Sequence, residues 1–557
     1  MRREYIVERN NYQLNYKKVG ITGIIFVLII FLAIILVKKA IFIEKKEGEL
    51  SLVINNRKVN TKQEIYINED GIIYLSEDDI RNFFDKYLLL DYENNQLITT
   101  YDKHIGVIDF TQNTMLVNGS NSKIKGNVIK KDDIIYIPFS EMKLVFDVEI
   151  SYLEDEQNIV VTTCSREIKQ ALAKKNLWVK ENPKRFSQIV DTIKKGETVI
   201  VAGTENGYTK IRTASGEIGY VSAKKLVNEV VVRESMEETN KGQVSLLWDY
   251  YSDYGKAPDR TGTTYPGINV VSPAFFSLVK LGKGDLVDKV GSDGMKYMNW
   301  AEENGYKVWA MVQNDGMIET TSEILNSYKL RTDCINNIVR AAVLYRLDGI
   351  NIDFEYMYEA DKNAFSRFII ELYPRLKEYG ITLSVDVTAP DGAENYSLCY
   401  DRNTIASNCD YIIFMAYDQY NTSKEGTTSG YNWVKTSLDK FIKREEVPAE
   451  KLILALPFYA RLWKTEDGKT TNSVVSLKNM EKSIPEGLEN LWKEDLKQYY
   501  IEYSEDGTLY KLWIEDDESL GYKLDLFNEY QLAGVAFWAA DRENDTIFNV
   551  IQSKLKK

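Results

Sequence analysis

Eight short apolar segments within residues 240–557 most constrain what this chain can fold into. They are residues 244–248, 268–272, 308–312, 349–354, 381–387, 411–416, 452–457 and 534–538. Most are continuously apolar, as expected of parallel strands that are buried on both faces. Helical patterns lie between them, for example at 335–345 and 364–379. Eight alternating strand and helix units in a region of this length predict an α/β fold, a TIM (β/α)8 barrel.

The interval between the seventh and eighth predicted strands is much longer than the others. It contains further strand patterns at 474–476 and 500–514. Loops that follow barrel strands lie at the C-terminal face, where barrel enzymes carry their chemistry. We therefore expect an α+β insertion over about residues 460–525, on the catalytic face.

The fourth predicted strand carries three polar side chains in an alternating pattern. Its sequence from Asp348 reads DGINIDFE. Because side chains alternate along a strand, Asn351, Asp353 and Glu355 share one face, and the apolar residues between them face the helices. Two carboxyls stacked in a poorly hydrated barrel cannot both ionise easily, so the pKa of one of them should rise. The pattern predicts a general acid near neutral pH, with Glu355 outermost at the mouth of the barrel.

This segment is similar to the D-x-x-D-x-D-x-E signature of glycoside hydrolase family 18, and the resemblance covers residues 240–557. It implies that Glu355 is the proton donor and that Asp353 orients the acetamido group of the substrate. It also implies substrate-assisted, retaining hydrolysis, in which the substrate's own N-acetyl oxygen attacks the anomeric carbon. Asn351 occupies the second acidic position, which keeps a hydrogen-bonding group but removes one charge. Asp348 and Asn351 are then supports, and Asn351 is also predicted as a substrate contact.

Further positions match the same family. The sequence MAYD ends the sixth predicted strand and fits the family's Met-x-Tyr-Asp, which implies that Tyr417 donates to the acetamido carbonyl and that Asp418 binds the same group or the sugar. Trp538 ends the eighth strand, where the family keeps a stacking Trp. Asn314 is predicted as a further substrate contact. The alternative for Tyr417 and Trp538 is ordinary core packing.

One departure from typical chitinases bears on the substrate. After the third strand the chain has Gln313-Asn314 in place of the usual Ser-x-Gly-Gly, and residues 513–519 read WIEDDES. These features resemble the spore-associated branch, whose members act on cortex peptidoglycan. We therefore expect a glycosidase that cleaves N-acetylglucosaminyl bonds of cell-wall or spore-cortex peptidoglycan. The alternatives are a chitinase or chito-oligosaccharide hydrolase, and a non-catalytic, lectin-like wall scaffold that the presence of Glu355 disfavours.

Two small β-rich domains are predicted before the barrel. Residues 50–163 contain a faint repeat, in which the strands at 73–75 and 135–137 each lead into a short helix. This order resembles the repeat at the N-terminus of copper amine oxidases and implies an adaptor or spacer without copper. Residues 168–228 show five short strands, which predict a small barrel. Their order resembles a bacterial SH3-like domain, which implies attachment to wall peptide or glycan, with a plain spacer as the alternative.

A run of 19 residues without charge, residues 19–37, lies near the N-terminus. As a helix it would span about 28 Å, close to the hydrocarbon thickness of a bilayer. Two lysines follow it and no small-residue cleavage site is present. We expect an uncleaved transmembrane signal anchor over 19–39, a cytoplasmic tail over 1–18 and a catalytic domain outside a cell membrane crossed once.

Composition narrows the remaining possibilities. The net charge of −13 argues against non-specific binding of nucleic acid. With His104 as the single histidine and no C-x-x-C pair, histidine-based metal sites are nearly excluded. We therefore expect neither a metal nor a cofactor, an N-acetylated glycan as the main partner, and four thiols that are mostly buried. The oligomeric state stays open.

Overall fold

The structure is a computed structural model, and it describes residues 27–32, 41–43, 48–234, 242–252, 255–422 and 424–555. Residues 27–32 of the predicted anchor are helical; the predicted tail, 1–18, and the rest of the predicted anchor, 19–26 and 33–39, lie outside the described residues. Within the described part of the chain, no helix is long and apolar enough to cross a bilayer. The chain divides into one unit of Met1–Phe84 with Lys125–Thr239 and a second of Asp85–Ile124 with Asn240–Lys557.

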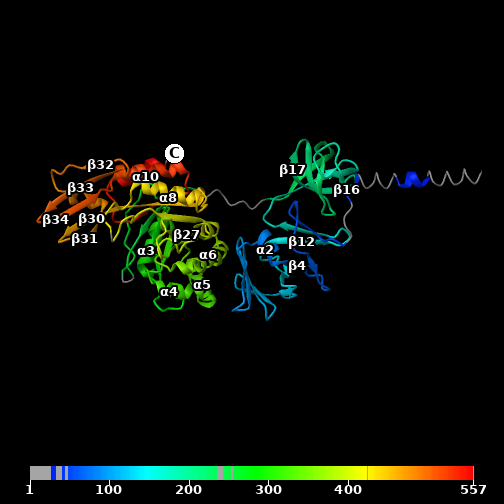
Figure 1. Cartoon of the computed structure of the whole chain (residues 1–557), viewed down its shortest axis with the longest axis horizontal. Coiled ribbons are helices and arrows are strands. Elements are labelled where there is room, and N and C mark those ends of the chain that lie inside the picture. The colour runs from blue at the N-terminus through cyan, green and yellow to red at the C-terminus, as the bar shows by residue number, and fades with distance from the viewer. Residues whose placement is uncertain are drawn as a thin grey trace, which may run out of the picture. The chain divides into compact units, whose positions relative to one another are not determined.

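Eight parallel strands close into a barrel in the second unit, which confirms the predicted TIM barrel (Figure 1). The strands are β21 Val244–Asp249, β22 Val270–Pro273, β25 Lys307–Gln313, β26 Gly349–Asp353, β27 Thr382–Val387, β28 Tyr411–Met415, β29 Leu452–Pro457 and β35 Gly534–Trp538. Strand β22 pairs in parallel with both β21 and β25, and β35 with both β21 and β29. These pairings close the ring, so no barrel edge is left open.

Helices cover the outside of the barrel (Figure 1). They are α3 Gly291–Glu303, α4 Ile318–Asn326, α5 Tyr328–Leu344, α6 Lys362–Lys377, α7 Arg402–Ser407, α8 Tyr431–Lys443, α10 Asp517–Tyr530 and α11 Ile547–Leu555. Phe354 is fully buried on the helix side and stacks on Phe368 of α6 at 5.6 Å between ring centroids. Burying a side chain of this size stabilises the fold by about 1.5–3 kcal/mol. Trp248, Trp309 and Met311 belong to a separate cluster inside the barrel.

The insertion between β29 and β35 is an antiparallel sheet. Its strands are β30 Tyr459–Glu466, β31 Lys469–Ser476, β32 Leu491–Lys493, β33 Gln498–Glu505 and β34 Thr508–Trp513, in the order β31-β30-β34-β33-β32. Asp506 and Gly507 both have positive φ in the turn before β34, as a tight hairpin requires. Buried Trp463 donates its indole N–H to the carbonyl of Gly426 at 2.8 Å, which fastens the sheet to the loop after β28.

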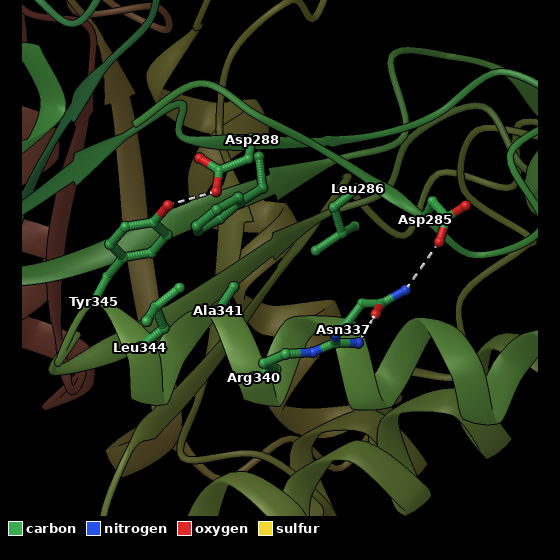
Figure 2. Close-up of a pocket in the computed structure, with 9 residues that line it drawn as sticks. Asp285, Leu286, Asp288, Asn337, Arg340, Ala341, Leu344 and Tyr345 are labelled. Atoms are coloured by element: carbon green, nitrogen blue, oxygen red, sulfur yellow. Dashed lines mark hydrogen bonds between the residues drawn. The ribbon is translucent and has the colours of Figure 1, made fainter. Parts of the chain in front are cut away.

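A short hairpin, β23 Phe276–Leu278 with β24 Leu286–Asp288, extends the barrel sheet outward beside α5. Between hairpin and helix lies a pocket of about 300 Å³, drawn in Figure 2. Its polar groups bond to one another: the Tyr345 hydroxyl donates to Asp288 at 2.6 Å, and Arg340 donates to Asn337. No side chain of the predicted active site lines it.

Residues 85–124 of the second unit form a meander of five antiparallel strands. These are β5 Leu89–Asp91, β6 Gln96–Tyr101, β7 His104–Asp109, β8 Thr114–Val117 and β9 Ser120–Lys123. Asn118 and Gly119, both with positive φ, form the β8–β9 turn. Of the four cysteines, Cys334, Cys399 and Cys409 are buried and Cys164 is half-buried, and none of the four forms a disulfide.

In the first unit, the two repeated segments lie side by side. Strand β4 Ile73–Ser76 leads into α2 Glu77–Phe83, and β11 Ile134–Ile137 leads into a single 3-10 turn, Phe139–Glu141. The strands β4 and β11 pair antiparallel with each other. The resemblance to the copper amine oxidase repeat stays a prediction. A second sheet of this unit has the order β12-β13-β1-β2, with β1 Ser51–Ile54, β2 Arg57–Val59, β12 Val148–Leu153 and β13 Asn158–Thr163.

Seven strands, rather than the five predicted, follow in the same unit. They are β14 Ile168–Ala173, β15 Leu177–Lys180, β16 Ile189–Ile193, β17 Thr198–Glu205, β18 Tyr208–Arg212, β19 Ile218–Ser222 and β20 Leu226–Arg233. Strand β20 is largely exposed and pairs with β14. Strand β20 is held in the sheet by main-chain hydrogen bonds to β14. Because neither of its faces is buried, its sequence shows little alternation of apolar and polar residues, and this alternation is the signal by which a strand is predicted.

Candidate active site

The polar residues of the fourth barrel strand lie as the alternation predicts. Asn351 and Asp353 belong to β26 and are buried, and Glu355 follows two residues beyond the end of the strand. Ile350 and Ile352, the residues between them, are fully buried in the cluster that packs against the helices. The strand therefore turns its apolar side chains outward and its polar ones toward the barrel interior.

Glu355 is held in place through its main chain. The Asn314 side chain accepts a hydrogen bond from the Glu355 N–H at 2.9 Å and donates one to the Glu355 carbonyl at 2.8 Å. It also donates to Thr321 at 3.0 Å. Asn314 is 1% exposed, so its amide is occupied in positioning Glu355. The geometry favours this positioning role for Asn314, and the predicted sugar contact stays a prediction.

The environment of Glu355 favours its protonated form. Burial, and then the charges of Asp353 and Asp418, raises the pKa of Glu355 to about 8 from its ordinary value of 4.5. A low-polarity surrounding disfavours the ionised carboxylate, and neighbouring negative charges add to the effect. At neutral pH, Glu355 can therefore keep a proton and deliver it to a leaving group.

Asp353 lies one step deeper and has one oxygen to spare. Gln313, the last residue of β25, donates from Nε2 to Oδ2 of Asp353 at 3.2 Å. The other carboxylate oxygen, Oδ1, is buried and accepts no hydrogen bond from any residue that the structure describes. Burial raises the pKa of Asp353 to about 6; the bond from Gln313 opposes this rise and the charge of Asp315 adds to it. A buried oxygen without a partner is costly, so Oδ1 is suited to receive an N–H from a ligand.

Asn351 is the centre of a hydrogen-bond network inside the barrel. It accepts from the indole N–H of Trp248 at 2.9 Å and donates from Nδ2 to Ser384 at 3.1 Å and to Asp386 Oδ1 at 2.7 Å. Burial and then the charge of Asp353 raise the pKa of Asp386 well above its ordinary value. The carboxyl that Asn351 lacks is thus present on the neighbouring strand β27, hydrogen-bonded to Asn351 itself.

Aromatic side chains line the same mouth of the barrel. The Tyr417 ring lies 6.5 Å from the ring of Trp538, and Trp538 also contacts Trp248 at 5.7 Å and Tyr250 at 5.6 Å between centroids. Burial raises the pKa of the Tyr417 hydroxyl well above 10, with contributions from Tyr459, Asp386, Asp353 and Glu355. Tyr417 therefore stays a neutral donor beside the carboxyl groups.

Asp418 faces the insertion. It accepts from the Tyr459 hydroxyl at 2.7 Å and pairs through both oxygens with Arg461 Nη2 at 2.8 Å. Arg461 also donates to Asn472. Tyr459, Arg461 and Asn472 all lie on the antiparallel sheet of the insertion. Asp418 thus joins the sixth barrel strand to the insertion. Its predicted sugar contact stays a prediction.

Sequence reasoning missed several residues that the fold brings to this site. Asp386 could have been found from the sequence, because Ser384 and Asp386 alternate within an apolar strand in the same way as Asn351 and Asp353. No sequence pattern indicates Tyr459 or Arg461, because they begin an insertion whose placement depends on tertiary contacts. Within the described residues, no group of three His, Cys, Asp or Glu side chains is arranged to hold a metal ion.

Comparison with known families identifies the barrel. A model of the family described as glycosyl hydrolases family 18 matches residues 247–543, more than half of the chain. The chain belongs to this family. A model of the bacterial SH3 domain matches residues 175–227. The resemblances to family 18 and to the bacterial SH3-like domain are confirmed, and the catalytic barrel is that of a glycosidase.

Curated relatives agree with this assignment, and a solved structure shares the fold. The chain is 25% identical over 306 residues to the uncharacterized glycosylase YvbX of Bacillus subtilis, covering 52% of this chain and 85% of that protein. It is 24% identical to the cortical fragment-lytic enzyme of Bacillus anthracis, covering 40% of this chain and 52%, about half, of that relative. A chitinase from Chromobacterium violaceum has the same fold, with a TM-score of 0.51, 22% identity, and coverage of 57% and 100% of the two chains.

Proposed function

We propose that this chain hydrolyses N-acetylglucosaminyl bonds in the peptidoglycan of a bacterial cell wall or spore cortex by substrate-assisted, retaining catalysis. One observation carries the proposal. Glu355, a carboxyl whose pKa lies at about 8, stands above Asp353, whose Oδ1 has no partner among the described residues. This pair can protonate a leaving oxygen while holding an acetamido group in place for attack.

The first step places the substrate. The exposed part of the Trp538 ring offers an apolar floor for the sugar whose bond is cleaved. The Tyr417 hydroxyl donates to the acetamido carbonyl, and Asp353 Oδ1 accepts the acetamido N–H. These two contacts turn the carbonyl oxygen toward the anomeric carbon. The acetamido oxygen and the anomeric carbon are then already oriented for reaction, which lowers the entropic part of the activation barrier.

The second step breaks the glycosidic bond. The acetamido oxygen forms a bond to the anomeric carbon, Glu355 gives its proton to the departing oxygen, and an oxazolinium-like ring remains. Water then opens this ring and returns a proton to Glu355. Asp386 bonds to Asn351 and Asp418 bonds to Arg461, so both carboxyls have other partners. Membership of family 18 implies that the substrate supplies the nucleophile.

The wall is favoured over chitin as the source of the glycan. The chain carries a bacterial SH3 domain, which is typical of wall attachment, in addition to its barrel. Relatives include proteins named as cortical fragment-lytic enzymes, although a Serratia marcescens chitinase is also similar at 22% identity. The test is a turnover assay of the whole protein on spore cortex, vegetative wall and chitin fragments. Faster release of sugar ends from chitin than from both wall preparations would contradict the proposal.

The source of the nucleophile has its own test. If the substrate's acetamido group attacks, glycan that is de-N-acetylated at the cleaved sugar should not be hydrolysed there. A thiazoline mimic of the cyclic intermediate should inhibit. Efficient cleavage of the de-N-acetylated glycan would show that an enzyme group or water attacks directly.

We further propose that residues 19–39 anchor the protein in the cell membrane, with the catalytic barrel outside. The support is the uncharged run at 19–37, followed by Lys38 and Lys39, together with a substrate that lies outside the membrane. Protease added to intact protoplasts should remove the barrel from the cells. Survival of the full-length protein under that treatment, with degradation after lysis, would show the opposite orientation.

A further inference from the structure

A second concave site lies in the first unit, where several chain segments meet. It is a pocket of about 460 Å³. Its walls come from the β1–β2 hairpin, the end of α2, the turn after β13 and strands β17 and β18. The lining residues are Ile54, Asn55, Asn56, Arg57, Val59, Asn82, Phe83, Arg166, Ala202 and Lys210. The SH3-like sheet, through β17 and β18, and the sheet of β12, β13, β1 and β2 thus each contribute a wall.

Hydrogen bonds fix these walls relative to each other. Arg212 of β18 is 9% exposed and donates from Nη1 to the Asn55 carbonyl at 2.7 Å and to Thr162 at 3.1 Å. The Asn55 side chain accepts from the Thr163 N–H at 2.9 Å, and Asn158 donates to the Ser215 carbonyl at 2.6 Å. Separating the two sheets would leave the buried guanidinium of Arg212 without these acceptors, which costs free energy. The pocket is therefore a built feature of this unit.

The lining is cationic although the chain is acidic. Arg57, Arg166 and Lys210 line the pocket, and none of the ten lining residues is Asp or Glu. Neither an ion pair nor a side-chain hydrogen bond joins these three cations to another residue that the structure describes. In the pocket of Figure 2, by contrast, Arg340 already donates to Asn337. Arg57 and Arg166 are exposed and Lys210 is half-buried. Three cations that line one pocket without ion-pair partners, in a chain of net charge −13, leave a local positive field.

We propose that this pocket binds an oxyanion group, a carboxylate or a phosphate, carried by the wall polymer. Guanidinium groups match both oxyanions through paired N–H donors, and the amides of Asn56 and Asn82 in the lining offer neutral donors. Only the source of the anion rests on the proposed function. The pocket would hold the protein on the polymer through its charged substituents, separately from the sugar that enters the barrel.

The test uses the whole protein and probes without sugar, so that the barrel site does not contribute. The probes are an acidic stem-type peptide, the same peptide with its carboxylates amidated, and a glycerol phosphate oligomer, each titrated by calorimetry at low and at physiological salt. The peptide with free carboxylates, the phosphate oligomer or both should bind, and affinity should fall as salt rises. Binding of the acidic peptide alone identifies a carboxylate source, and binding of the oligomer alone identifies a phosphate source.

Variants locate the binding. Arg57→Gln, Arg166→Gln and Lys210→Gln should each weaken binding about tenfold, the loss typical of one charge-assisted hydrogen bond. Lys58→Gln is the matched control, because Lys58 lies on β2 next to Arg57 but does not line the pocket. Melting temperatures check that each variant folds. Equal binding by the three variants and the control, equal binding of the amidated peptide, or no binding of any probe would overturn the proposal. If the wild-type protein binds in this way but does not hydrolyse wall glycan, the proposed function fails and this inference stands.

Discussion

Replacing Glu355 with Gln should raise the free energy of unfolding at alkaline pH above that of the wild-type protein and should remove most of the hydrolytic activity. The pKa of Glu355 is about 8 in the folded protein against an ordinary value of 4.5, a difference worth up to about 5 kcal/mol. Below pH 4.5 both the folded and unfolded states hold the proton, and there is no cost. Between pH 4.5 and 8 the unfolded state ionises first, so the free energy of unfolding falls, and above pH 8 the full cost is reached.

Glu355→Gln removes this ionisation and keeps the shape of the side chain. Its melting temperature should match that of the wild-type protein at pH 4 and exceed it at pH 9. Its turnover of wall fragments, followed as released sugar ends, should fall by about 10²–10⁴-fold because the proton donor is lost. Glu359→Gln is the matched control, since Glu359 is exposed and lies four residues further along the chain. It should change neither quantity.

Two results would refute this reasoning. An equal difference in melting temperature between Glu355→Gln and the wild-type protein at pH 4 and pH 9 would show that Glu355 does not ionise in a buried environment. Wild-type turnover by Glu355→Gln would show that another group delivers the proton. Because the two measurements are independent, they separate an error about burial from an error about catalysis.

Other predictions follow from the same geometry. Turnover of the wild-type protein should rise as Asp353 ionises near pH 6 and fall as Glu355 ionises near pH 8; a flat profile over this range would count against both roles. Asp353→Asn should lower turnover. Because the charge of Asp353 raises the pKa of Glu355, the alkaline limb of the pH–turnover profile should also move to lower pH in this variant. An unmoved limb would show that the two carboxyls are not coupled. Tyr417→Phe removes one hydrogen bond to developing charge. By analogy with an oxyanion donor, the fall in kcat/KM should correspond to a loss of transition-state stabilisation on the order of 2–4 kcal/mol. An effect on KM alone would show that Tyr417 only binds the sugar. A chelator should leave turnover unchanged, and loss that a divalent ion restores would contradict the metal-independent mechanism.

The sequence by itself determined the barrel and the strand that carries the acid. Each of these depends on a local pattern. Continuous apolar runs indicate strands that are buried on both faces, and period-two alternation fixes which side of a strand a residue faces. Glu355 and Asp353 could therefore be placed on the inner side of the fourth strand from DGINIDFE alone.

The tertiary structure decided which groups meet these carboxyls. Asp386 bonds to Asn351 across 35 positions, and Arg461 reaches Asp418 across 43. Such contacts depend on strand register and on the closure of the barrel, which no local pattern specifies. The pKa of Glu355 also depends on burial and on charges from other strands, so its rise was predictable in direction only. The cationic pocket of the first unit has the same origin, because its three cations come from separate segments that only the packing of the two small sheets brings together.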